Sequence, residues 1–201
     1  MALAEIFIKG GTAILLLPFG MRILQHWIQD PGQITYPLLL ATESMTLFFT
    51  LTCQQPRHRE HRLGALFPSL VATFYFYLLD LEAGRTWLPE PYPALLICLG
   101  ALWQIYAKYS LGRAFGLLPA YRRLVDQGAY AVVRHPIYLG YLISHCGFLC
   151  AHASLHNLMV YTGLYSLQFW RIRNEERYLA RHADYRAYQQ RIRWRLIPGV
   201  F

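Results

Sequence analysis

The chain has 201 residues, of which 55% are hydrophobic and 15% charged, and its formal net charge is +8. Soluble globular domains usually carry about 25% charged residues, so this composition argues against a soluble enzyme and for a membrane protein. A net positive charge also occurs in nucleic-acid-binding proteins, but here the basic residues alternate with long apolar segments, and we expect no nucleic-acid partner.

Six apolar segments follow one another along the chain, each bounded by polar residues, Pro or Gly. In chain order they cover residues 6–28, 36–53, 63–81, 92–111, 137–151 and 155–170. They approach the ~20 residues that a helix needs to cross a bilayer. The last two are shorter, and the turn HASLHN between them predicts a helical hairpin. We therefore expect an all-α, polytopic integral membrane protein of about six transmembrane helices, forming one domain over residues 1–201, with a four-helix part at 1–110.

The first segment also has one feature of a secretory signal peptide, a Lys before an apolar run. The run continues through Arg22 without a small-residue cleavage site, so we interpret it as a membrane helix.

The basic residues indicate the orientation. When successive loops are assigned to alternate sides, one side holds all 19 Lys and Arg residues except Arg22 and Arg85. By the positive-inside rule, both termini and the functional loops face the cytosol, at the inner membrane if the chain is bacterial.

Ionisable residues are rare inside the apolar segments. Glu43 stands in the second and Asp80 at the end of the third. Transporters usually carry such groups near the middle of the membrane, so a transporter or a structural membrane protein is an alternative function. Glu43 either pairs with a polar neighbour or lines a substrate tunnel. The four cysteines have no metal-ligand or redox spacing, and we expect no metal site.

Residues 111–140, LGRAFGLLPAYRRLVDQGAYAVVRHPIYLG, form the first polar-rich segment. Asp126-Gln127-Gly128 predicts a turn in which Gly128 adopts a positive φ. Pro136 suits the first position of a helix, where a missing N–H has no consequence.

Arg134 and His135 therefore stand at the mouth of a helix whose free N–H groups and dipole favour an anion. Tyr130 and Tyr138 would supply aromatic walls beside them. As an alternative, Arg134 and His135 only anchor the helix at the membrane interface.

Residues 171–201 form the second polar-rich segment. If the sixth helix continues past residue 170, Arg171 and Glu175 share one face, while Glu176 points in another direction. A solvated, charged helix exit is the alternative. Further on, the pattern predicts a weak amphipathic helix on the membrane surface, followed by an extended piece at 191–196 against the protein body.

The order LGRAFG, LVDQGAYAVVRHPIYLGY, two apolar helices, NEERYL and DYRAYQQRIRWRLIPGVF resembles the isoprenylcysteine carboxyl methyltransferase and phospholipid methyltransferase group of integral membrane enzymes. The chain is most similar to small bacterial members. The resemblance covers roughly residues 100–201.

This resemblance implies S-adenosylmethionine as methyl donor, with S-adenosylhomocysteine as product, in a cytosolic pocket. Arg171 and Glu175 match the catalytic, substrate-side pair. The implied cofactor-binding residues are Leu124, Val125, Gly128, Tyr130, His135, Pro136, Tyr138 and Glu176. Arg122 and Arg123 depart from the pattern, because carboxyl methyltransferases of this type often have a His there.

The implied reaction is methyl transfer to a lipophilic acceptor in the membrane, through a carboxylate, an amine or a thiol. A carboxylate is already nucleophilic at neutral pH, whereas an amine or thiol must lose a proton, with Glu175 or His135 as base. A membrane reductase of the steroid reductase type shares the expected topology and would bind NADPH, so titration with each cofactor separates the two enzymes.

Overall fold

The computed structural model describes residues 2–29, 31–32, 35–53, 58–59, 71, 75–80, 85–89, 91–115, 120–121 and 123–201. The helices are α1 (Ala2–Gln29), α2 (Thr35–Thr52), η1 (Tyr75–Leu78), α4 (Tyr92–Leu111), η2 (Gly112–Ala114), η3 (Gly128–Ala131), α5 (Pro136–Ala151), α6 (Leu155–Leu179) and α7 (Ala183–Arg191). The strands β1 (His58–Arg59) and β2 (Ala120–Tyr121) form one short antiparallel pair. The described part is thus almost wholly helical, which confirms the expected class in outline.

The helices agree with the predicted apolar segments where the structure describes them. α1, α2 and α5 begin or end within a few residues of prediction, and α4 has the predicted bounds. α6 continues beyond residue 170 to Leu179, which places Arg171 and Glu175 on one helix. The predicted segment 63–81 falls mostly outside the described residues, and its described part includes η1. Among the described helices, one stretch, Tyr92–Ala114, is long and apolar enough to cross a membrane, so six spans stay a prediction.

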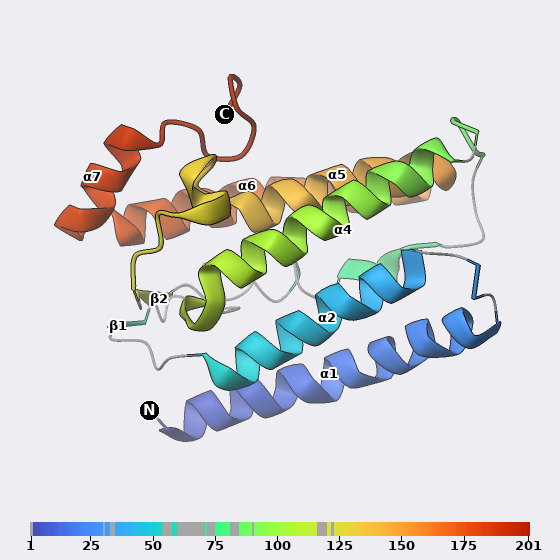
Figure 1. Ribbon diagram of the computed structural model, residues 1–201, viewed down its shortest axis with the longest axis horizontal. Helices are drawn as coiled ribbons and strands as arrows, with labels where there is room; N and C mark the ends of the chain where they lie inside the picture. The colour runs from blue at the N-terminus through green and yellow to red at the C-terminus, as the bar shows by residue number, and fades with distance from the viewer. Residues whose placement is uncertain are drawn as a thin grey trace.

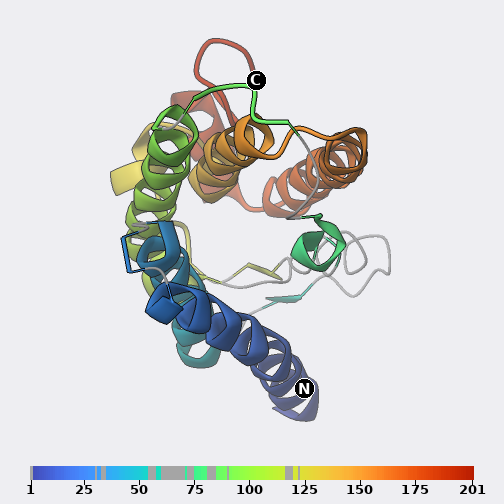
Figure 2. The same ribbon diagram turned by 90° about the vertical axis from the view of Figure 1, so that its right-hand side faces the viewer.

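Neighbouring helices lie side by side in the order α1, α2, α4, α5, with α6 beyond α5 (Figure 1). Viewed from the end, these helices form an arc, and η1 lies beside α6 (Figure 2). α7 and the C-terminal segment cover the C-terminal end of α6, which lies next to the start of α5. That end gathers both polar-rich segments of the sequence.

Glycines bring α4 and α5 into close contact. A Cβ built on Gly100 would lie 2.5 Å from the Ser144 backbone nitrogen and 2.7 Å from the Gly140 carbonyl oxygen. A Cβ on Gly147 would lie 2.8 Å from the Pro93 carbonyl oxygen. Small residues at such positions let helix backbones approach, as in membrane helix pairs. α4 therefore holds α5 in place along most of its length.

Polarity is inverted relative to a soluble protein. α4 exposes large apolar side chains along one face, Leu95, Leu99, Leu102, Tyr106 and Tyr109. In contrast, Lys108 is fully buried, and its Nζ donates to the Thr42 carbonyl oxygen at 2.9 Å and to Thr46 Oγ1 at 2.8 Å. An apolar outside and a hydrogen-bonded polar inside suit a protein surrounded by lipid.

We predict that Gly100→Ala lowers stability by about 2 kcal/mol, because two of the three nearest atoms that the new methyl group would meet belong to the α5 backbone and cannot rotate away. Thermal unfolding of the detergent-purified protein measures the change. Gly163→Ala on α6 is the control, since a Cβ there meets nothing within 4 Å, and better helix propensity should raise stability by up to about 1 kcal/mol. Equal midpoints for the two variants would contradict the close packing.

Candidate active site

The loop before α5 is held by local contacts that the sequence predicted in part. Gly128 has φ +61°, as expected for the turn, and a Cβ there would lie 2.5 Å from Ser110 Oγ. The Ala129 N–H donates to the same hydroxyl at 3.3 Å. At the next residue, the Tyr188 hydroxyl of α7 donates to the Tyr130 carbonyl oxygen at 2.7 Å. The loop is thereby fixed between α4 and α7.

α5 begins at Pro136, which confirms the predicted first helical position. The Trp103 indole N–H of α4 donates to the Pro136 carbonyl oxygen at 2.9 Å and fixes the first turn. Just before it, the Arg134 and His135 backbone N–H groups donate to the carbonyl oxygens of Trp194 (3.0 Å) and Arg195 (2.8 Å). The predicted extended C-terminal piece therefore lies directly against the RHP motif.

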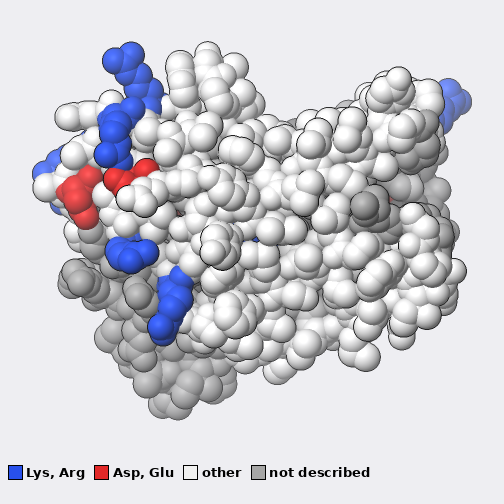
Figure 3. Space-filling model, viewed as in Figure 1, with Lys and Arg blue, Asp and Glu red and all other residues white. Residues whose placement is uncertain are grey.

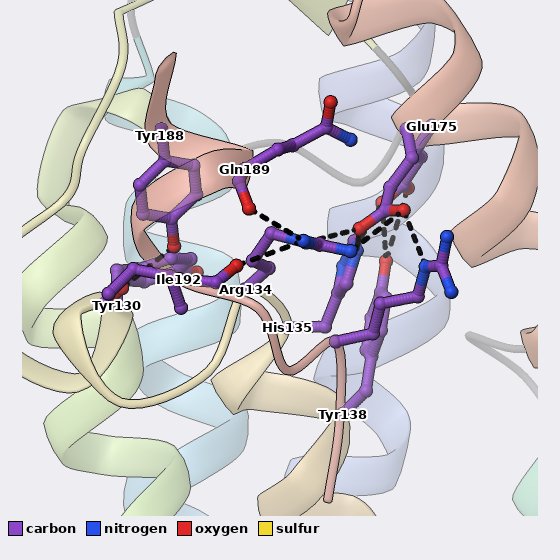
Figure 4. Close-up of polar contacts among 10 residues, drawn as sticks. Tyr130, Arg134, His135, Tyr138, Glu175, Tyr188, Gln189 and Ile192 are labelled. Carbon is purple, nitrogen blue, oxygen red and sulfur yellow. Dashed lines mark hydrogen bonds and ion pairs between the residues drawn. The ribbon is translucent and has the colours of Figure 1, made fainter. Parts of the chain in front are cut away.

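The sequence suggested that Arg134 and His135, at the start of α5, favour an anion from outside the protein. In the structure the Arg134 charge is instead bound within the protein. The Arg134 guanidinium is bound to Glu176 of α6 through Nε (2.7 Å to Oε1) and Nη2 (3.2 Å to Oε2). Its Nη1 donates to the Ile192 carbonyl oxygen at 2.9 Å and faces that of Gln189 at 3.5 Å (Figure 4). Arg134 therefore joins elements of the protein to one another.

Glu176 is the centre of this arrangement. It is 5% exposed, and besides Arg134 it accepts from Arg195 Nε (2.6 Å to Oε2) and lies 3.4 Å from His135 Nε2. A carboxylate has about four lone-pair sites, and these contacts occupy all of them.

These partners explain the acidity of Glu176, which lies beyond the predicted membrane segment. Burial opposes its ionisation, but the hydrogen bonds and charge of His135, followed by the hydrogen bonds of Arg195 and Arg134, outweigh burial and lower the pKa to about 2. Glu176 is thus ionised at every physiological pH.

A second cluster is built around the neighbouring carboxylate, Glu175. The Tyr138 hydroxyl donates to it at 3.1 Å and 3.2 Å, and Arg171 Nε donates at 3.0 Å. His135 Nδ1 lies 3.9 Å from Glu175 Oε2. The His135 and Tyr138 rings are stacked with centroids 5.5 Å apart, and the Arg171 guanidinium lies 5.2 Å from the Tyr138 ring centroid (Figure 4).

The two clusters meet at His135, whose two ring nitrogens face different carboxylates. The side chain of Glu175 is 16% exposed and that of Glu176 is 6% exposed. Glu175 is therefore the more accessible of the two carboxylates, and the predicted difference in direction between these neighbours is confirmed.

The C-terminal part corrects one expectation from the sequence. α7 forms as predicted, but its Tyr185 and Tyr188 are buried within the protein, so this face does not lie on a membrane surface. Further on, the Phe201 ring stacks on Phe169 of α6 at 4.6 Å, and Arg195 lies 5.0 Å from the Phe201 ring centroid. Aromatic rings prefer one another to a wet surface where both can be covered.

The structure brings His135, Tyr138, Arg171, Glu175 and Glu176 together by direct contacts. Pro136 and Tyr130 flank this group, while Leu124 and Val125 are half-buried in the loop and their contact with a cofactor stays a prediction. Arg122 lies outside the described residues, and Arg123 is exposed.

Sequence reasoning missed Arg134 and Arg195 as partners of Glu176. A buried acidic residue needs basic partners, but the sequence alone offers many basic residues in this region and no rule for choosing between them.

Comparison with known proteins bears directly on this region. Residues 92–186 match the family model described as phospholipid methyltransferase. No curated protein and no solved structure matches the chain. The matched segment contains α4, α5, α6 and both carboxylates. This segment, slightly less than half of the chain, is thus similar to the phospholipid methyltransferase family, which confirms the resemblance found in the sequence.

We predict that Glu176→Gln destabilises the protein by roughly 3 kcal/mol at pH 7, because it leaves buried cationic groups without their partner. Since the folded pKa is lowered from 4.5 to about 2, the ionised carboxylate contributes stability above pH 4.5, and this contribution is lost as the pH falls toward 2. The gap in thermal midpoint between the unaltered protein and the variant should narrow over that window.

The control is Asp126→Asn, which breaks an exposed ion pair with Arg191 and should change stability by less than about 1 kcal/mol. A Glu176→Gln variant no less stable than the Asp126→Asn variant would contradict the assignment of Glu176 as the central ion-pair partner.

Proposed function

We propose that the chain is an S-adenosylmethionine-dependent methyltransferase whose acceptor is a lipophilic molecule dissolved in the membrane. The observation that carries the proposal is the joined cluster of His135, Tyr138, Arg171 and Glu175 within the segment that matches the family. The site would face the cytosol, the side on which we also expect both termini.

The residues of the cluster fit the proposed cofactor chemically. A sulfonium carries a positive charge, which the Glu175 carboxylate, the more accessible of the two, would attract. His135 offers a polar ring edge next to the same carboxylate. When bound, S-adenosylmethionine supplies a methyl group: a lone pair of the acceptor forms the new bond, and the carbon–sulfur bonding pair leaves with sulfur.

The protein's own task in such a displacement is alignment and exclusion of water. Glu176, whose acceptor sites are all occupied, acts in this proposal by holding His135 and the start of α5. Tyr138 and Arg171 orient Glu175 from two sides.

The acceptor determines whether a base is needed. A carboxylate acceptor gives an ester without losing a proton, and Arg171 is the group to orient it. An amine or a thiol releases one proton, which Glu175 or His135 would receive. In either case the acceptor reaches the cluster from the lipid.

The surface supports this location. Lys and Arg side chains mostly gather toward the end of the molecule where α7 lies, and the middle of the same face carries almost no charge (Figure 3). A charged end next to an uncharged band is typical of a protein that sits in a bilayer with its polar site at the boundary.

We predict that His135→Ala and Glu175→Gln each weaken S-adenosylmethionine binding or lower methyl transfer at least tenfold, because each removes a group that would contact or orient the sulfonium. Calorimetry on the detergent-purified chain measures binding, and transfer of labelled methyl groups to a total lipid extract of the producing cells measures turnover.

His156→Ala is the control for loss of an imidazole. His156 is exposed and contacts the Leu78 carbonyl oxygen, away from the cluster, so binding and turnover should stay unchanged. Binding and turnover at the unaltered level in both site variants would overturn the proposed site, and preferential binding of NADPH would overturn the proposed reaction.

A further inference from the structure

The polar side chains between α5 and α6 bind one another below the proposed active site. His145 of α5 is buried, with Nε2 2.5 Å from the Tyr75 hydroxyl of η1 and Nδ1 2.7 Å from the Tyr165 hydroxyl of α6. Nearer the active site, Arg171 of α6 packs on Tyr138 of α5. Two successive layers of contact between α5 and α6, one at His145 and one at Tyr138, are thus filled by side chains that bind one another.

Gln168 of α6 lies between these two layers. It follows Tyr165 and precedes Arg171 by three residues each, so the three side chains share one face of the helix. Gln168 is 6% exposed, and its Oε1 has no hydrogen-bond partner among the described residues. A buried carbonyl oxygen without a donor is unfavourable, and natural proteins leave few of them unsatisfied. This oxygen is therefore left for a donor that the described part of the chain does not supply, and its surroundings decide whether a ligand can provide it.

Gln104 of α4 provides an internal comparison. It is 4% exposed, and its Oε1 also lacks a partner within the described part of the chain. However, its Nε2 is bound to Ser144 Oγ at 3.3 Å, and a Cβ on Gly140 would lie 2.5 Å from its Cγ. Gln104 thus sits where α4 and α5 are in closest contact, with no space for a ligand.

The surroundings of Gln168 differ, because α6 approaches the α5 backbone at only a few positions, and large side chains fill the distance between them. Side chains can shift to admit a ligand, whereas the backbones of α4 and α5 cannot. Gln168 also lies one helical turn from Arg171, which the proposed function places at the acceptor.

We propose that the Gln168 carboxamide oxygen accepts a hydrogen bond from an N–H or O–H group of the methyl acceptor. This inference rests on the proposed function and narrows it: Gln168 is a specificity-determining residue that selects acceptors carrying such a donor close to the methylated atom. The rest of the acceptor, being lipophilic, extends along the helices into the membrane.

The test uses the detergent-purified full chain, labelled S-adenosylmethionine and serial dilutions of a total lipid extract from the producing cells. Gln168→Met keeps the volume of the side chain but removes its acceptor oxygen, and should raise the half-saturating lipid concentration about tenfold. The dissociation constant of S-adenosylmethionine, measured by calorimetry, should not change. Gln104→Met, the matched variant in the closed contact, should leave both quantities at their original values.

A second measurement identifies the donor. Dodecanol and dodecyl methyl ether differ in one O–H group, and we expect dodecanol to inhibit methyl transfer by the unaltered protein more strongly. Gln168→Met should remove this preference while Gln104→Met retains it.

An unchanged half-saturating concentration in Gln168→Met, or equal effects of the two probes on the unaltered protein, would overturn the inference and indicate that the oxygen is satisfied by water alone. These outcomes leave the proposed function standing. Failure of the unaltered protein to bind S-adenosylmethionine or to methylate the extract would overturn the proposed function, and with it this assignment.

Discussion

The candidate site depends on a buried negative charge that needs partners from two other parts of the chain. Glu176 of α6 is held by Arg134 and His135 at the start of α5 and by Arg195 of the C-terminal segment. An ionised carboxylate without such partners would be strongly destabilising at this depth. The contacts therefore support one another, and together they fix the position of the His135 ring. The second cluster, in which His135 stacks on Tyr138 beside Glu175, depends on this fixed position of the His135 ring.

The helices around this site carry apolar side chains outside and hydrogen-bonded polar groups inside. α4 and α5 meet through glycines and present apolar side chains outward, while α2 and α4 bury Lys108 against threonine oxygens. Because the backbones of α4 and α5 are in close contact, the acceptor of the proposed reaction would not enter between these two helices. α5 and α6, which contact each other mainly through side chains, lie on the other side of α5, and the charged cluster stands at the end of this helix pair. A water-soluble donor and a lipid-soluble acceptor can meet at such a boundary.

The sequence predicted the local features of this structure better than the long-range ones. The bounds of α4, the positive φ of Gly128 and the helix start at Pro136 each follow from a few adjacent residues. Arg171 and Glu175 were placed on one face because helix periodicity fixes neighbours four residues apart. In contrast, Arg134 and Glu176 are 42 residues apart in the chain, and no local rule selects that pair among many. The burial of the α7 tyrosines was also not predictable, because an amphipathic face packs equally well on a membrane or on protein.

The segment that matches the family does not contain all that the site needs. It ends at residue 186, whereas Arg195 supplies one partner of Glu176, and the carbonyl oxygens of Gln189 and Ile192 hold the Arg134 guanidinium. The last residue, Phe201, stacks on Phe169 of α6, and the Arg195 guanidinium lies over the Phe201 ring. The motif residues of the matched segment are thus positioned by a tail beyond it. The tail thus supplies a partner to Glu176, the less exposed of the two adjacent carboxylates, whose side chain is 6% exposed against 16% for that of Glu175.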